Sequence, residues 1–460
     1  MDTLLAVVIR RPYEHRKTGG PDTMKRRYTI WAAVVIAFAL LAAACGGGDE
    51  ASDTTTSAPA ETTTTEAPAT TTTVGETTTT EALPPLVVWA DANQSEAIMA
   101  VGAAFTEATG VELIVEIVDR GTLKDDVILN APAGEGPDIF AGAHDWIGEL
   151  ASNGVIAPVD LGGREGEFLP TALTAMKWDS EQFGVPFVTE AIAMYYNPDL
   201  VAEPPATMAE LTAACDELDD AVSCLVLPGG NDVGDAYHNQ PFITAFGGHI
   251  FGLSDDGFDG SEVLLGSDET ILGAELLETL VTDGYVPSTN YGDAKNLFVN
   301  GEAAFWITGP WEIGSLNNPE ENLAAPNWAV AKMPTVDGNK MRPHVGIQGF
   351  YLSAFATNAA IAQEFLLNFI ATDETMLALF EADPRGTAYV SVFDSIQADP
   401  VAAVFAASAA DGTYMPNIPE MGSVWGPVGD NFLLLRNGEI GAAEAMTTAQ
   451  EQVVSAIEGG

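Results

Sequence analysis

The chain has 460 residues, 47% of them hydrophobic, so it is long enough to bury one or two sizeable cores. Its 66 Asp and Glu far outnumber its 17 Lys and Arg, which gives a formal net charge of −49. Phosphate backbones would repel a chain this acidic, so the composition argues against nucleic acid as a partner.

The N-terminal region predicts export and lipid attachment. A basic start at residues 24–27 precedes an apolar run that ends at Cys45, which is the order of a secretory signal. The stretch 41–45 resembles a bacterial lipobox, whose cysteine thiol accepts a diacylglyceryl chain. We therefore predict a lipoprotein signal peptide over 24–44 and lipidation of Cys45, with residues 1–23 a mis-assigned start. The alternative, an uncleaved membrane helix, needs about 20 apolar residues, and this run is shorter.

Residues 45–85 predict a disordered tether. Runs of Thr alternate with Ala, Pro and Glu, so the segment has almost nothing with which to form a core. As a flexible coil it would reach about 35 Å.

The remaining cysteines, Cys215 and Cys224, predict a disulfide that closes a short surface loop in an exported chain. The sequence contains no CxxC or HxxxH spacing, so we predict no metal site and no cofactor.

From residue 86 onward the pattern is that of alternating strands and helices. We expect strands at 86–90, 111–118, 138–142 and 303–307, and helices at 95–109, 267–283, 359–372 and 442–457. The first strands and helix predict a mostly parallel α/β sheet with helices on both faces. Ligands of such sheets lie beyond the carboxyl ends of the strands, here the loops 91–95 and 143–147.

Two carboxylates, Asp145 and Glu190, are candidates for chemistry or for binding. As a pair they could hydrolyse a glycosidic bond, and as acceptors they could bind sugar hydroxyls. The sequence leaves both roles open. It lacks the GxxxxGK, GxSxG and HExxH signatures of common enzymes.

Three aromatic residues lie in segments marked by Gly and Pro, where we expect loops: Tyr237, Trp311 and Trp425. Aromatic side chains outside the core faces offer flat apolar surfaces on which the C–H faces of a pyranose ring can stack. Taken together, the three favour a sugar-binding cleft.

The order of landmarks along the chain resembles a known family. The landmarks are Leu86-Val87-Val88-Trp89, Gly136-Pro137-Asp138-Ile139, Ala143-His144-Asp145, Glu190-Ala191, Tyr196-Asn197, Gly309-Pro310-Trp311 and Met415-Pro416-Asn417-Ile418-Pro419 with Trp425. They resemble the maltose/maltodextrin-binding proteins of bacterial ABC importers, in the extracellular solute-binding family 1. The resemblance implies a two-lobed α/β fold of the type II periplasmic-binding-protein kind, with a ligand cleft between an N-terminal lobe (86–189 plus 348–393) and a C-terminal lobe (190–347 plus 394–460).

The resemblance also implies a set of ligand-binding residues: Asn93, Gln94, Asp145, Trp146, Glu190, Asp235, Tyr237, Trp311, Met415 and Trp425. Two departures concern one loop, where Gly142 stands in place of a frequent tryptophan and Trp146 in place of an arginine. An aromatic has thus moved four residues along, which leaves the identity and length of the sugar open.

We therefore expect a monomeric, lipid-anchored, extracytoplasmic substrate-binding protein that delivers maltodextrin or a related oligosaccharide to ABC importer subunits, closing its lobes on the ligand. It is not expected to be an enzyme. The alternatives are a receptor for another solute (a polyol, glycerol-phosphate, trehalose or an iron chelate), a surface glycosidase or an adhesin. Lys and Arg are scarce near the expected loops, which argues against an anionic ligand.

Overall fold

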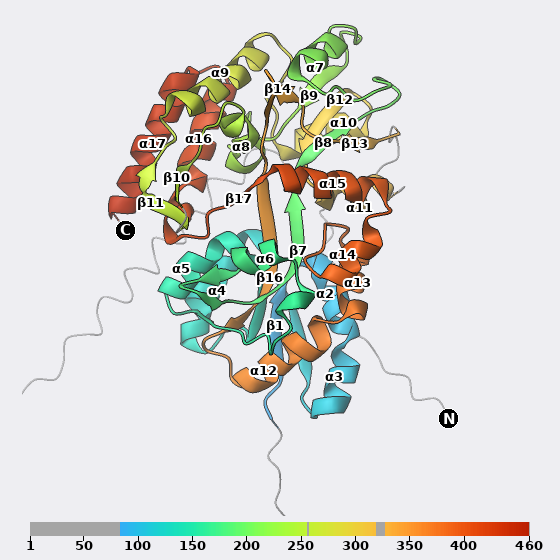
Figure 1. Ribbon diagram of the computed structural model, residues 1–460, viewed down its shortest axis with the longest axis vertical. Coiled ribbons are helices and arrows are strands. Elements are labelled where there is room, and N and C mark those ends of the chain that lie inside the picture. Colours follow the sequence, from blue (N-terminus) through green and yellow to red (C-terminus); the bar gives the residue numbers. More distant parts are fainter. Residues whose placement is uncertain (1–82, 255–256, 319–326, 460) are drawn as a thin grey trace, which may run out of the picture. The chain divides into compact units, whose positions relative to one another are not determined.

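The computed structural model describes residues 83–254, 257–318 and 327–459 (Figure 1). The predicted signal peptide, Cys45 and nearly all of the predicted tether lie outside the described residues. Residues 83–85, the last of that tether, are exposed and have no regular secondary structure. In the described part of the chain, no helix combines the length and the apolar character needed to cross a membrane.

The first large sheet has seven strands in the order β17-β16-β3-β1-β2, with β4 and β7 also paired to β16. Its strands are β1 (Leu86–Ala90), β2 (Leu113–Ile117), β3 (Ile139–Ala143), β4 (Ile156–Ala157), β7 (Val185–Ala191), β16 (His344–Ser353) and β17 (Thr413–Tyr414). β1 is parallel to β2 and β3, as the sequence predicted. The sheet as a whole is mixed, because β16 is antiparallel to β3, β4 and β7.

The second large sheet has four strands in the order β13-β8-β12-β9. They are β8 (Ala193–Tyr196), β9 (Ser223–Val226), β12 (Ala303–Thr308) and β13 (Ala329–Ala331). The two-stranded sheets pair β5 (Lys177–Trp178) with β6 (Glu181–Gln182), β10 (Phe251–Ser254) with β11 (Gly257–Val263), and β14 (Thr335–Val336) with β15 (Asn339–Lys340). Each large sheet is packed within its own buried apolar clusters, which is the arrangement of a two-lobed α/β protein.

β7 and β16 lie side by side in the first sheet, and in Figure 1 they run vertically through the middle of the ribbon. β7 leads directly into the second sheet, since β8 begins two residues after β7 ends. The lobe boundaries implied by the resemblance, at 189/190 and 347/348, fall inside β7 and β16. They remain a prediction.

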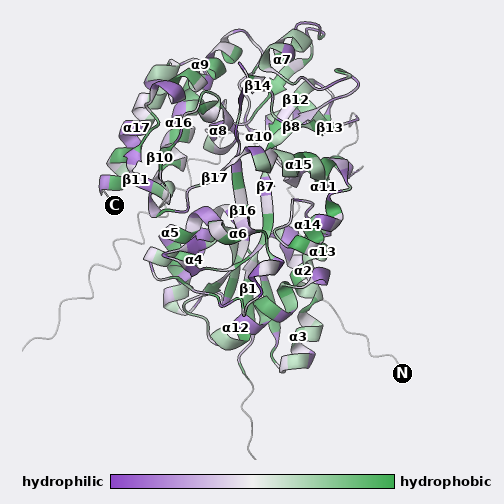
Figure 2. Ribbon diagram, viewed as in Figure 1, coloured by the Kyte–Doolittle hydropathy of each residue, from purple (hydrophilic) through white to green (hydrophobic). Residues whose placement is uncertain are grey.

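The helices that surround the sheets are α2 (Ala92–Ala100), α3 (Gly102–Thr109), α4 (Arg120–Asn130), α5 (Ile147–Ser152), α6 (Pro170–Ala175), α7 (Met208–Cys215), α8 (Ala236–Thr244), α9 (Asp268–Thr282), α10 (Tyr291–Val299), α11 (Ile313–Asn317), α12 (Ala359–Phe365), α13 (Asp373–Ala382), α14 (Val390–Ile396), α15 (Pro400–Asp411), α16 (Trp425–Arg436) and α17 (Ala442–Gly459). α9 lies within the predicted range 267–283, and it begins after Ser267, whose side chain caps the helix. α17 buries residues at helical spacing, and Figure 2 shows hydrophobic and hydrophilic residues along it.

Two predicted helices differ in detail from the structure. The helix expected over 95–109 is two helices, because the chain bends at Val101 between α2 and α3. Gly110, in the left-handed region with φ 73°, ends α3 as predicted. The helix expected over 359–372 is α12 followed by a π-helical turn, η5 (Leu366–Ile370).

Cys215 and Cys224 form a disulfide. It joins the end of α7 to the beginning of β9, so it closes a short loop at the edge of the second sheet. This is the local link that the sequence predicted.

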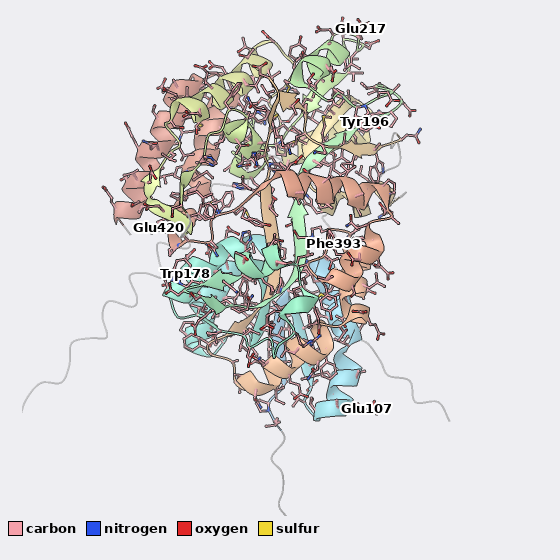
Figure 3. All side chains as sticks on the ribbon, viewed as in Figure 1. Glu107, Trp178, Tyr196, Glu217, Phe393 and Glu420 are labelled. Atoms are coloured by element: carbon pink, nitrogen blue, oxygen red, sulfur yellow. A yellow bond between two sulfur atoms is a disulfide. The ribbon has the colours of Figure 1, made fainter. Side chains whose placement is uncertain are left out.

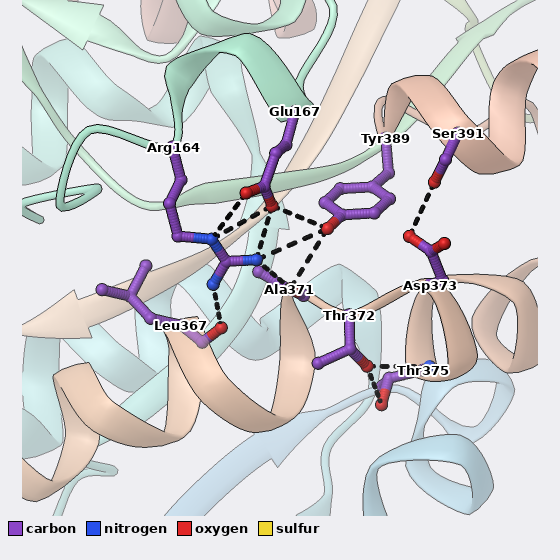
Figure 4. Close-up of polar contacts among 9 residues, drawn as sticks. All are labelled: Arg164, Glu167, Leu367, Ala371, Thr372, Asp373, Thr375, Tyr389 and Ser391. Carbon is purple, nitrogen blue, oxygen red and sulfur yellow. Dashed lines mark hydrogen bonds and ion pairs between the residues drawn. The ribbon is translucent and has the colours of Figure 1, made fainter.

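A polar cluster around Arg164 fastens a loop of the first lobe to the helical segment that covers it (Figure 4). The Arg164 guanidinium donates to the Glu167 carboxylate at 2.5–3.0 Å and to the carbonyl oxygens of Leu367 and Ala371. Tyr389 donates its hydroxyl to Glu167 at 2.7 Å. Hydrogen bonding to the Arg164 guanidinium holds the pKa of Glu167 below its usual value, so the cluster is charged at neutral pH.

We predict that Gly148→Ala destabilises the protein by about 1–3 kcal/mol, because α5 packs its second residue directly on the backbone of 417–419. A Cβ at Gly148 would lie 2.5 Å from the Pro419 nitrogen. Urea unfolding would measure the change. Gly314→Ala in α11 is the control, because no atom lies within 4 Å of its added Cβ. A loss of stability no larger at 148 than at 314 would contradict the packing argument.

Candidate functional site

A cavity of about 550 Å³ is lined by residues of three strands of the first sheet, β3, β7 and β16, and by residues of helices and loops, among them α8 and α10. It is lined by Asp91, Asn93, Arg120, Ala143, Asp145, Trp146, Glu190, Tyr237, His238, Tyr291, Trp311, Gln348, Arg385, Met415 and Trp425. Its size is that of small-molecule binding sites in proteins.

Much of the wall consists of the first turns of helices. Tyr291 and Trp425 are the first residues of α10 and α16, and Asn93 and Tyr237 are the second residues of α2 and α8. The sequence placed Tyr237 and Trp425 in loops, and this expectation was wrong. Side chains in a first helical turn point back toward the helix N-terminus, which directs these residues into the cavity.

The aromatic side chains form a wall on one side of the cavity. The Tyr237 ring lies 6.1 Å from that of Trp311 and 6.4 Å from that of Trp425, measured between ring centroids. Trp311 lies in the 3-10 turn η4 (Pro310–Glu312), and its ring covers Gly309 so closely that a Cβ there would lie 2.0 Å from it. The glycine before the Pro-Trp pair therefore makes room for the indole.

Trp146 covers Gly142 in the same way, since a Cβ at Gly142 would lie 2.6 Å from the Trp146 ring. The two departures noted in this loop are thus coupled. In this orientation the Trp146 indole leaves no room for a side chain at position 142. The aromatic surface of this loop therefore comes from Trp146.

The Trp311 indole is fixed by a chain of hydrogen bonds. Its Nε1 donates to the Tyr291 hydroxyl at 2.6 Å, and Tyr291 donates to Glu312. Glu312 also pairs with Lys295 at 2.9 Å. Burial and the neighbouring Glu312 charge raise the pKa of Tyr291, so its hydroxyl keeps its proton and remains a donor.

The polar side of the cavity is built around Glu190, on β7, which is 5% exposed. Its carboxylate accepts hydrogen bonds from Gln348 at 2.9 Å and from Arg385 at 3.3 Å. Arg385 also donates to Asp383, and Arg120 donates to the Gln348 amide oxygen at 3.1 Å. Two arginines therefore line the cavity, and the expectation that basic residues are scarce at the site was wrong.

Asp145 lies on the same wall of the cavity, and the buried His144 lies behind it. The His144 Nδ1 accepts a hydrogen bond from the Ile347 N–H at 3.0 Å. Because Nδ1 is the acceptor, Nε2 carries the proton and donates to the Met415 carbonyl oxygen at 3.1 Å. Burial lowers the pKa of His144 and raises that of Asp145, each opposed by the other's charge. Trp425 donates its indole N–H to Asp145 at 3.2 Å, which links the aromatic wall to a carboxylate.

The structure brings most of the sequence-predicted binding residues to the cavity wall, namely Asn93, Asp145, Trp146, Glu190, Tyr237, Trp311, Met415 and Trp425. Gln94 is 2% exposed and does not line the cavity. Asp235 does not line it either, because its carboxylate accepts from the backbone and ring of His238. Whether any of these residues touches a ligand remains a prediction.

The sequence reasoning missed several lining residues: Asp91, Arg120, His238, Tyr291, Gln348 and Arg385. Asp91 could have been predicted, because it begins the loop 91–95, which the sequence predicted to bind a ligand. Arg120 and Arg385 could not have been predicted, because their partners are far away in the sequence. Arg120 contacts Gln348, 228 residues away, and Arg385 contacts Glu190, 195 residues away. Within the described ranges, no group of three or more His, Cys, Asp or Glu side chains could hold a metal ion.

We predict that His344→Phe makes the protein less sensitive to acid. His344 packs its ring 5.9 Å from those of Tyr237 and Trp425, and neither of its ring nitrogens has a partner among the described residues. Burial, with the charge of His144 second, lowers the pKa of His344 to about 3. Below pH 6.5 the His344 ring therefore takes up a proton in the unfolded chain and stays neutral in the folded chain. This difference lowers the free energy of unfolding by about 2 kcal/mol from pH 6.5 to pH 5.

Urea unfolding at pH 7 and pH 5 would test this. His344→Phe should remove that part of the pH dependence, while His249→Phe, at an exposed position, should change it little. Equal pH dependence in the wild type and His344→Phe would show that His344 titrates normally in the folded protein.

Comparisons with known proteins agree with the fold. Residues 100–409 match the family model described as bacterial extracellular solute-binding protein. The chain is 26% identical over 393 residues to the galactooligosaccharide-binding protein of Bacillus subtilis, covering 81% of this chain and 89% of that protein. It is 29% identical over 369 residues to the maltotriose-binding protein of Pyrococcus abyssi, covering 76% of each.

The fold is similar to the crystal structure of a cyclo/maltodextrin-binding protein complexed with maltotetraose. The TM-score is 0.72 at 28% sequence identity, and the match covers 82% of this chain and 99% of the other. The match to the family model extends over well more than half of the sequence. The chain therefore belongs to the bacterial extracellular solute-binding protein family.

Proposed function

We propose that this chain is the oligosaccharide receptor of a bacterial ABC importer. The observation that carries the proposal is the aromatic wall of Tyr237, Trp311 and Trp425 in the same cavity as the carboxylates Asp145 and Glu190. Pyranose rings present apolar C–H faces and a rim of hydroxyl groups, which match stacking surfaces and hydrogen-bond acceptors respectively. The named ligands of the similar proteins, galactooligosaccharides, maltotriose and maltotetraose, are all neutral oligosaccharides.

The charges on the cavity wall support a neutral ligand over a phosphorylated one. Asp91, Asp145 and Glu190 face Arg120 and Arg385. Arg385 is 4% exposed and already paired with Glu190 and Asp383, so it offers little attraction to an anion. Although basic residues are present, they do not make the cavity positive.

The same pairing weighs against a glycosidase. Hydrolysis needs one carboxyl group free to donate a proton and one free to act as base or nucleophile. Both Glu190 oxygens accept hydrogen bonds from protein donors, and Asp145 accepts from Trp425. Binding asks less of these groups, because an acceptor can share its lone pairs with a ligand hydroxyl.

The remaining features of the proposal concern delivery. We infer lobe closure about the segments near β7 and β16, because the cavity is lined both by strands of the first sheet and by α8, which packs with β9 and β12 of the second sheet. Attachment through Cys45, the tether, the monomeric state and the importer subunits as partners rest on the sequence and on the resemblance. Two similar proteins from Streptococcus pneumoniae are named as solute-binding lipoproteins of maltooligosaccharide ABC transporters, which supports the same arrangement here.

The purified chain should bind a neutral oligosaccharide, with a rise in melting temperature and heat measurable by titration calorimetry. Maltotriose, a galactooligosaccharide, trehalose and glycerol-phosphate form an informative panel. We expect binding of at least one neutral sugar and none of glycerol-phosphate. A panel in which only the phosphate binds, or in which nothing binds, would contradict the proposal.

We predict that Trp311→Ala weakens sugar binding by about 1–3 kcal/mol, because the ligand loses a stacking surface. Trp178→Ala is the matched control, since Trp178 lies on β5 outside the cavity (labelled in Figure 3). Calorimetry should show a weaker dissociation constant for the first variant alone. If both variants bind as the wild type does, Trp311 is not part of the binding surface.

A further inference from the structure

His238 is a buried polar side chain on the cavity wall that has one ring nitrogen partnered and one not. The residue is 5% exposed and lines the cavity. Its Nδ1 lies 2.8 Å from the Asp235 carboxylate, while Nε2 is shielded from solvent and has no partner among the described residues. A buried nitrogen without a hydrogen bond costs free energy, so its place on a binding cavity calls for an explanation.

Asp235 fixes which nitrogen carries the proton. Its Oδ1 accepts from the His238 backbone N–H at 2.7 Å, which caps α8, and its Oδ2 faces Nδ1. Burial alone would raise the pKa of Asp235, but the attraction and hydrogen bonds of His238 outweigh it and hold the pKa below its usual value. An ionised carboxylate only accepts, so Nδ1 is the donor, and of the two neutral tautomers this pairing selects the one that carries its lone pair at Nε2.

The surroundings of the ring restrict what can approach that lone pair. The His238 ring meets Tyr291 at 5.7 Å and Trp311 at 5.9 Å, both edge to face, and it lies 5.5 Å from Tyr237. The Tyr291 hydroxyl is already committed to Glu312 and Trp311. The His238 ring therefore adjoins the rings of Trp311 and Tyr237, on which a sugar would stack, and these rings must shift slightly for a ligand hydroxyl to reach Nε2.

We propose that His238 is a specificity-determining residue whose Nε2 accepts a hydrogen bond from a hydroxyl of the bound sugar, with Asp235 as the positioning residue that selects this tautomer. The inference rests on the proposed function, since it needs a hydroxyl-bearing ligand. It assigns Asp235 an indirect role in place of a direct contact. A lone pair at this position would also disfavour a phosphate, because it repels an anion and favours a donor.

Three variants test the proposal by calorimetry with the sugar of the panel that the wild type binds. His238→Phe keeps a flat ring against Tyr291 and Trp311 but removes the acceptor, and it should weaken binding roughly tenfold. His238→Gln retains an oxygen acceptor and should recover part of that loss. His249→Phe, at an exposed position, should bind as the wild type does.

Asp235→Asn separates positioning from folding. Asparagine also caps helices, so α8 should keep its N-terminus, but its amide would donate to Nδ1 and move the ring proton to Nε2. Nitrogen-15 NMR of the His238 ring should show Nδ1–H in the wild type and Nε2–H in the variant, with weaker sugar binding in the variant.

The outcomes separate this inference from the proposed function. A wild type that binds no sugar overturns both. A wild type that binds sugar while His238→Phe binds it equally well overturns this inference alone, as does a wild-type ring that carries its proton on Nε2. Weaker binding in His238→Phe, partial recovery in His238→Gln and the change of tautomer in Asp235→Asn support it.

Discussion

The pairing of the buried Glu190 carboxylate organises the site. A carboxylate that is 5% exposed must be hydrogen-bonded and neutralised, because removing one partner of a buried ion pair leaves an uncompensated charge at a cost of about 3–5 kcal/mol. Its partners come from two distant parts of the chain, Gln348 on β16 and Arg385 beyond α13. The hydrogen bonds of the Glu190 carboxylate therefore join three segments of the chain at the cavity wall. Gln348 extends this network, because its amide oxygen accepts a hydrogen bond from Arg120.

The sequence predicted the elements whose signals are local. β1 appears where a continuous apolar run stood, α9 begins after its capping serine, and α3 ends at a glycine in the left-handed region. α8 was not predicted because its polar residues, His238, Asn239 and Gln240, are consecutive and do not recur at helical spacing, and because Pro241 lies inside it. Tyr237 was for that reason placed in a loop, although its place in the site was anticipated.

The site was predicted where aromatic and acidic residues stand out along the chain, as Trp311, Trp425 and Asp145 do. It was missed where a residue acquires its role through a partner far away. Asp235 shows the difference: the family resemblance implied a ligand contact, yet its carboxylate accepts from the backbone and ring of His238 on its own helix. An acidic residue at a helix start is read from sequence as a cap or as a ligand, and only the fold decides between them.

The aromatic wall packs against two imidazole rings. His344 packs against Tyr237 and Trp425, and His238 packs against Trp311. The indole nitrogens of both tryptophans are meanwhile held by hydrogen bonds, to Tyr291 and to Asp145. Because these large side chains are already held at face and edge, they lose little conformational entropy when a ligand binds. The cost of ordering them on binding is therefore small. If the lobes close on a ligand as proposed, the part of the site that changes is the position of one sheet relative to the other, while the aromatic wall stays fixed.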